Sequence, residues 1–199
     1  MSNIIDLRSI SFDTSFLLKD SSLVDGIIKV LKKDGINCYI TSTVVSEIEQ
    51  LKIWGRITKN EYQKVMKRWN SLKPDVIDFK NRFLSDGFGK TCVKSMEEHH
   101  GVKPKDIIND CSILVTTLKN GIDIFLSEDY HFTSKITEEV ISEIKNLACT
   151  EFHMMCGPTL YNLDSKTFLE AYNNKKIDID IIENNVKLIK KSKKNFWEN

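Results

Sequence analysis

Acidic side chains stand directly after two apolar segments of the sequence. Asp13 follows the segment that ends at Phe12, and Asp129 closely follows the segment that ends at Leu126. Each has an ordinary explanation on its own, because an Asp after a strand commonly caps a turn or a helix. If the two segments are neighbouring strands, however, their carboxylates approach each other and could act together.

Two further acids border the apolar faces of predicted helices. Glu47 precedes Ile48 on one such face, although a solvent-facing role explains it equally simply, and Asp110 lies three residues after Ile107 on another. Asp106 lies one turn before Asp110, where the helix dipole favours an acid. Like charges one turn apart destabilise a helix unless something neutralises them, so Asp110 is the acid that most needs a partner.

A divalent cation is the ordinary partner of carboxylates that converge. Two unit charges 4 Å apart repel by about 4 kcal/mol at an effective dielectric constant near 20. Oxygen ligands suit Mg²⁺ or Mn²⁺, and the sequence has no cluster of His and Cys that indicates zinc. His99 and His100 are adjacent, so they cannot share one face of a helix. The acids therefore predict a Mg²⁺ or Mn²⁺ site.

Short apolar segments that alternate with amphipathic helices have to position these acids. The pattern predicts strands at 8–12, 36–40, 75–79, 122–126 and 159–163. It predicts helices at 22–35, 42–55, 58–73, 90–100, 104–121, 136–147, 165–172 and 181–189. This alternation predicts an α/β fold of three layers, α/β/α, with a central parallel sheet and additional C-terminal helices. Such sheets bind ligands at the carboxyl ends of their strands.

Composition and charge narrow the function classes. The chain has 199 residues, with 29 Lys and Arg against 28 Asp and Glu, so its formal net charge is +1. This balance excludes a strongly basic protein that binds nucleic acid with its whole surface, but not a local basic patch. Five lysines cluster in the tail, at Lys187, Lys190, Lys191, Lys193 and Lys194. They fit a solvated helix end or, less simply, a patch that attracts phosphates.

The cysteines and the start of the sequence favour a cytoplasmic protein. The 5 cysteines are odd in number and include no C-x-x-C pair, so we expect reduced thiols that pack as small apolar residues. The first residues lack the pattern of a signal peptide. No run of about 18 apolar residues is present, so no membrane-spanning helix is expected.

Four short motifs contain the acids named above. They are Phe12-Asp13-Thr14-Ser15, Val44-Val45-Ser46-Glu47-Ile48, Asp110 and Ser127-Glu128-Asp129-Tyr130-His131-Phe132. In their order and spacing, these motifs resemble those of the PIN-domain nucleases, a family of bacterial and archaeal toxin ribonucleases and RNA-processing enzymes. The resemblance implies a PIN-like nuclease domain at residues 1–172 and a basic helical extension at residues 173–199.

The resemblance also implies roles for individual residues. The catalytic acids that it implies are Asp13, Glu47, Asp110 and Asp129. The metal ligands that it implies are Asp13, Asp110 and Asp129. Glu47 would orient a metal-bound water, and Ser15 would support the first acid. His131 stands where the family often carries a second Asp, and the extra acid Asp106 would compensate as a metal ligand.

The activity that the resemblance implies is the hydrolysis of single-stranded RNA by an endoribonuclease, with Mg²⁺ or Mn²⁺ as cofactor. The resemblance implies RNA as the substrate and an antitoxin or another protein as a partner. The helices after Ser165 could pack on the core, mediate the formation of a homodimer or hold a partner. A catalytically silent PIN-like module that binds RNA or a protein is the alternative, because His131 changes the last motif. A phosphatase with an Asp nucleophile would need a second Asp at Ser15, which disfavours that class.

Overall fold

A five-stranded parallel sheet forms the centre of the structure, a computed structural model in which residues 3–185 are described. Its strands are β2 (Ser9–Phe12), β3 (Asn37–Thr41), β4 (Asp75–Ile77), β5 (Ile124–Leu126) and β6 (Tyr161–Leu163). They lie in the order β4-β3-β2-β5-β6, and each neighbouring pair is parallel. The predicted parallel sheet is therefore confirmed.

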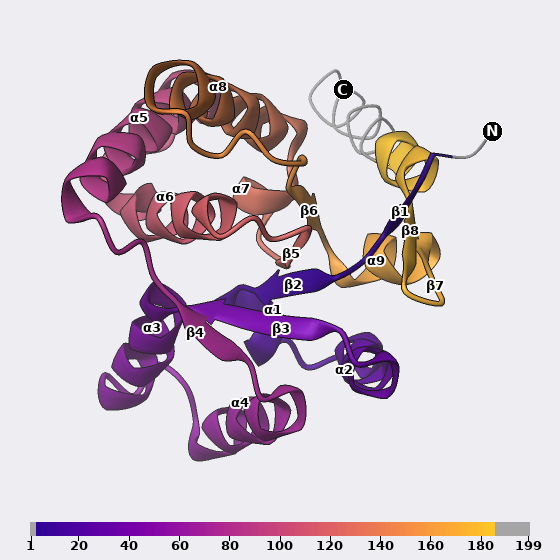
Figure 1. Cartoon of the computed structure of the whole chain (residues 1–199). Helices are drawn as coiled ribbons and strands as arrows, with labels where there is room; N and C mark the ends of the chain where they lie inside the picture. The colour runs from indigo at the N-terminus through magenta and orange to yellow at the C-terminus, as the bar shows by residue number, and fades with distance from the viewer. Residues whose placement is uncertain (1–2, 186–199) are drawn as a thin grey trace, which may run out of the picture.

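Helices cover this sheet. They are α1 (Thr14–Leu18), α2 (Ser22–Asp34), α3 (Ser42–Ile53), α4 (Lys59–Leu72), α5 (Arg82–His100), α6 (Pro104–Lys119), α7 (Tyr130–Thr133), α8 (Lys135–Phe152) and α9 (Ser165–Ala171). In Figure 1, α2, α3 and α4 gather on one side of the strands and α5, α6 and α8 on the other, which confirms the predicted three layers. Within residues 3–185, no helix combines the length and the apolar surface that crossing a bilayer requires.

Aromatic side chains at the ends of two central strands pack against the short helices that follow them. The residues of β5 are fully buried, as is typical of a parallel sheet with helices on both faces. Phe12 at the end of β2 stacks on Phe16 with ring centroids 5.3 Å apart, and Phe125 lies 5.0 Å from Phe132. Such pairs stabilise beyond their buried area. They hold the short helices α1 and α7 against the strands that precede them.

The sequence prediction missed two short helices, the start of a third helix and the three strands of a smaller sheet. The helices α1 and α7 are too short for a helical period to reveal them. Helix α5 begins at Arg82, well before the predicted residue 90, although Gly87 and Gly89 lie in its first turns. Glycine lowers helix propensity by about 1 kcal/mol relative to Ala, so packing overrides propensity in this segment.

A small antiparallel sheet connects the two ends of the described chain. It consists of β1 (Ile4–Asp6), β8 (Lys176–Asp178) and β7 (Tyr172–Asn173), in that order, and lies beside α9 in Figure 1. The domain boundary predicted between residues 172 and 173 falls within the β7 strand of this sheet. A helix begins at residue 179 and is described up to residue 185, whereas the five tail lysines lie outside the described residues.

Four of the 5 cysteines are paired, so the prediction of reduced thiols is wrong for them. Cys92 of α5 is joined to Cys111 of α6, and Cys149 of α8 is joined to Cys156 in the connection to β6. Their Cα atoms lie 5.6 and 5.0 Å apart, a spacing that tertiary packing creates and sequence spacing does not reveal. Cys38 is a free, buried thiol.

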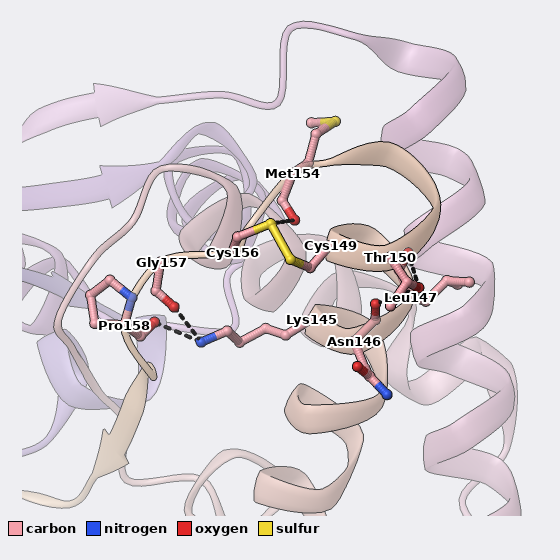
Figure 2. Close-up of a disulfide and its surroundings, with 9 residues drawn as sticks. All are labelled: Lys145, Asn146, Leu147, Cys149, Thr150, Met154, Cys156, Gly157 and Pro158. Carbon is pink, nitrogen blue, oxygen red and sulfur yellow. Dashed lines mark hydrogen bonds between the residues drawn. A yellow bond between two sulfur atoms is a disulfide. The ribbon is translucent and has the colours of Figure 1, made fainter.

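The turn after α8 is fastened at two points, as Figure 2 shows. One is the Cys149–Cys156 disulfide. The other is Lys145, whose Nζ donates to the carbonyls of Gly157 and Pro158 at 2.9 and 2.7 Å. Burial lowers the pKa of Lys145, and the two carbonyl groups accept hydrogen bonds from its partly buried ammonium group. Together these contacts fix the path of the chain into β6.

Candidate metal centre

The carboxyl ends of β2 and β5 lie side by side, as the strand-end acids predict. The two strands pair in parallel with Phe12 opposite Leu126, and the backbone N–H of Asp13 donates to the carbonyl of Leu126 at 2.9 Å. Strands β3 and β5 lie on opposite sides of β2, so the order in which the chain adds strands to the sheet reverses here. Open α/β sheets bind ligands at such a switch point. Asp13 and Asp129 follow directly from this edge.

Asp13 is buried and is held by two hydroxyls. Its Oδ2 accepts hydrogen bonds from Ser15 Oγ at 2.6 Å, from Ser127 Oγ at 3.0 Å and from the Ser15 backbone N–H at 3.2 Å. Burial raises the pKa of Asp13 above its usual value, although these hydrogen bonds oppose the rise. Ser15 thus contacts the first acid as the resemblance implies, and Ser127 adds a second contact from the end of β5.

Glu47 reaches the same edge from α3. Its Oε2 accepts from Thr14 Oγ1 at 2.6 Å, and its Oε1 accepts from Asn109 Nδ2 at 2.8 Å. Burial raises the pKa of Glu47, and the charge of Asp13 raises it further. These contacts tie α1, α3 and α6 together around the carboxylate. Sequence reasoning missed Thr14 and Asn109, whose only signal is that each is the chain neighbour of a predicted acid.

Asp110 of α6 carries the clearest electrostatic signature of the site. Burial, and then the charges of Asp13, Asp129 and Glu47 in that order, raise the pKa of Asp110 to about 7. Its side chain is 17% exposed, so these charges act across a partly desolvated space. The four predicted acids do converge, because all of them line one cavity.

His131 completes a group that could hold a metal ion. Its Nδ1 lies 3.6 Å from Asp110 Oδ2 and 3.9 Å from Asp129 Oδ1. Donor atoms of Asp110, Asp129 and His131 all lie within 4.8 Å of one another. Two carboxylate oxygens and an imidazole nitrogen form a suitable donor set for a divalent transition metal. His131 therefore lies beside the two acids, a position that sequence spacing does not reveal.

A cavity of about 400 Å³ gives access to the four acids. Its lining consists of Asp13, Thr14, Ser15, Leu18, Glu47, Gln50, Leu51, Trp54, Arg56, Asn109, Asp110 and Asp129. Asp106 is not part of this lining and is exposed in the first turn of α6. Its position fits a favourable interaction with the helix dipole, and its role as a metal ligand stays a prediction.

Glu128 has a structural role although it belongs to the last motif. Its carboxylate accepts from Lys19 Nζ at 2.6 Å and from the Ser165 backbone N–H at 3.1 Å. Burial opposes the ionisation of this group, but the hydrogen bonds outweigh it and hold the pKa of Glu128 below its usual value. Glu128 therefore links the end of β5 to α9 and to the end of α1.

Neither a protein-family model nor a curated protein matches this chain. The proposal of a function therefore depends on the residues of the site and on their geometry. A fold of this class serves many activities, so the fold by itself does not indicate one.

We expect His131→Ala to weaken the binding of Mn²⁺ at least about tenfold, because it removes one of three convergent donors. Titration calorimetry at pH 7.5 measures this affinity directly. The matched control is His99→Ala, which removes an exposed imidazole that lies 3.3 Å from Glu143 between α5 and α8. Equal Mn²⁺ affinity in the His131→Ala variant and the unaltered protein would exclude His131 from the metal centre.

Proposed function

We propose that the protein is a divalent-metal-dependent endoribonuclease of the PIN type, which hydrolyses single-stranded RNA. The observation that carries this proposal is the convergence of Asp13, Glu47, Asp110 and Asp129 beside one open cavity, at the carboxyl ends of two neighbouring strands. Burial and, after it, the charges of the other acids raise the pKa of Asp110 to about 7, and a cation would relieve the repulsion among the acids.

The metal would be Mg²⁺ or Mn²⁺. Asp110 and Asp129, with Asp13 as a further ligand, would supply carboxylate oxygens that suit both ions, and His131 would add an imidazole nitrogen that suits Mn²⁺ better. When bound, such an ion activates a coordinated water and stabilises the oxygen that departs from phosphorus. Ser15 and Ser127 fix the carboxylate of Asp13 through Oδ2, which orients it toward the cavity.

Glu47 has the properties of a group that orients a water molecule. Thr14 and Asn109 donate to its two oxygens, so the carboxylate has a fixed direction. A carboxylate oxygen that already accepts one hydrogen bond can accept another. Preorganised acceptors of this kind place the attacking water without rearrangement during the reaction.

The test is the cleavage of a labelled, unstructured RNA oligonucleotide by the purified protein. We expect internal cleavage with Mg²⁺ or Mn²⁺, fragments that carry a 5′-phosphate, and complete loss of cleavage in EDTA. A duplex of the same sequence should resist cleavage. Cleavage that persists in EDTA would contradict a metal-dependent mechanism, and a protein that binds metal yet leaves every RNA intact would contradict the enzyme.

A catalytically silent module is the second candidate, because His131 replaces an acid of the last motif. Under this alternative the chain would bind RNA or a protein partner without hydrolysis. Calorimetry separates the two candidates, since the silent module has no need of a metal. An antitoxin partner and a homodimer stay predictions.

A further inference from the structure

The C-terminal end of α3 presents an aromatic ring and a cation at the cavity that the acids line. Trp54 is 60% exposed, which is unusual for so large an apolar side chain. The guanidinium of Arg56 lies 5.1 Å from the centre of its indole ring, a cation–π contact. Trp54 and Arg56 both line the cavity that contains Asp13, Glu47, Asp110 and Asp129.

The backbone holds this pair in a fixed geometry. The N–H of Gly55 donates to the carbonyl of Lys52 at 3.1 Å, and the N–H of Arg56 donates to the carbonyl of Leu51 at 2.9 Å. These two bonds form a Schellman motif, which ends the helix. Gly55 has φ +64°, a left-handed conformation that favours glycine. Trp54 and Arg56 are therefore placed by the helix end and not by a loose loop.

The same helix also sets the spacing between Trp54 and Glu47. Trp54 follows Glu47 by about two turns of α3, so the two residues lie on one face of the helix, roughly 10 Å apart along its axis. One extended strand of nucleic acid could reach both positions.

Among the described residues that line the cavity, Arg56 is the one with a positive side chain. Two nearby lysines are engaged elsewhere, since Lys19 pairs with Glu128 at 2.6 Å and Lys52 lies 4.0 Å above the ring of Tyr62. The positive charge that can neutralise a phosphate of an entering nucleic acid is therefore that of Arg56, beside the exposed indole of Trp54.

We propose that Trp54 and Arg56 form a stacking subsite for an unpaired base next to the bond that is cleaved. This subsite rests on the proposed function for its relation to cleavage, whereas base binding itself requires no catalysis. Bases stack on aromatic faces without regard to sequence, and arginine adds a cation–π contribution and a phosphate contact. Base-paired strands hide these faces, so the subsite selects single strands.

A protein partner is the competing occupant of an exposed tryptophan. Docking surfaces for proteins usually bury a contiguous apolar patch with few charges in its centre. Trp54 instead lines one cavity with four acids and contacts an arginine, and the more exposed neighbour Ile53 is not part of that lining. The observations therefore favour a nucleotide base.

The test measures the affinity for a fluorescent single-stranded RNA decamer by anisotropy, in EDTA and at low ionic strength, so that no cleavage occurs. We expect Trp54→Ala to weaken binding about 5- to 100-fold and Trp54→Phe to keep most of the affinity. Ile53→Ala, which truncates the adjacent exposed side chain, is the matched control and should bind like the unaltered protein. A decamer without bases should bind equally to Trp54→Ala and to the unaltered protein.

Several results would overturn the subsite. Equal affinity of Trp54→Ala and the unaltered protein for the decamer rejects stacking, as does an unaltered protein that does not bind. A loss that is equally large with the strand lacking bases shows a structural effect. Loss of self-association without loss of RNA affinity shows a protein-docking role. If stacking is observed but no RNA is cleaved, the subsite stands and the nuclease proposal fails.

Discussion

Replacing Asp13 by Asn should lower the rate of metal-dependent RNA hydrolysis at least about a hundredfold, while the fold is retained. The variant removes the most buried charge of the acidic cluster, and a loss of about 2.7 kcal/mol of transition-state stabilisation already corresponds to a hundredfold. The side-chain carbonyl of Asn can still accept hydrogen bonds from Ser15 and Ser127, so we expect the local structure at the end of β2 to be retained without the charge.

The measurement is the initial rate of decamer cleavage at saturating Mn²⁺, with circular dichroism and thermal unfolding as checks on the fold. Asp20→Asn is the matched control, because it removes the same charge from an exposed residue that pairs with Lys64. A folded Asp13→Asn variant with the unaltered rate would refute the assignment of Asp13 to the catalytic centre.

Replacing Asp110 by Asn should stabilise the metal-free protein above pH 7 and abolish its activity. The folded state raises the pKa of Asp110 from 3.8 to about 7, chiefly by burial. Between these two values the folded protein retains a proton that the unfolded chain has lost, so this group makes stability fall as the pH rises. Asn does not titrate, so the variant does not lose the free energy of unfolding that the ionisation of Asp110 costs the folded protein. The expected gain is about 1–3 kcal/mol above pH 7 and close to zero below pH 4.

Urea unfolding in EDTA at pH 4.5, 6 and 8 measures this pH dependence. The control Asp106→Asn, one turn earlier on α6, should lose a few tenths of a kcal/mol at pH 8, because it removes a favourable interaction with the helix dipole. Mn²⁺ should then stabilise the unaltered protein more than the Asp110→Asn variant, since a ligand stabilises the state that binds it. A variant less stable than the unaltered protein at pH 8 would contradict a destabilising charge on Asp110 in the folded protein.

The sequence is most informative where a local pattern decides the structure. Asp13 and Asp129 each follow an apolar strand, and the pairing of Phe12 with Leu126 brings the strand ends together as predicted. Glu47 and Asp110 border apolar helix faces, which fixes the side of each helix on which they lie. The acidic cluster was therefore predictable in outline from strand order and helix period.

Tertiary contacts decide what the sequence could not show. Phe88 lies between Gly87 and Gly89 and is buried. Its ring centroid lies 6.2 Å from that of Phe79 and 5.4 Å from that of Phe152. This packing stabilises the early turns of α5. The edge strand β1 has an exposed, unremarkable pattern, and only its pairing with β8 makes it a strand. The approach of His131 to Asp110 is likewise a result of packing and has no counterpart in sequence spacing.

The Cys92–Cys111 disulfide closes residues 92–111 into a covalent ring, which includes the turn at Gly101 between α5 and α6. Both sulfur-bearing side chains are fully buried, so a reductant reaches them only when α5 and α6 separate. Closing such a ring lowers the conformational entropy of the unfolded chain, which stabilises the folded protein by about 3 kcal/mol in the loop-closure model. A protease nick at this exposed turn would consequently leave a single covalent molecule, with Asp110 still tethered beside the other acids, and two fragments would separate only after denaturation and reduction.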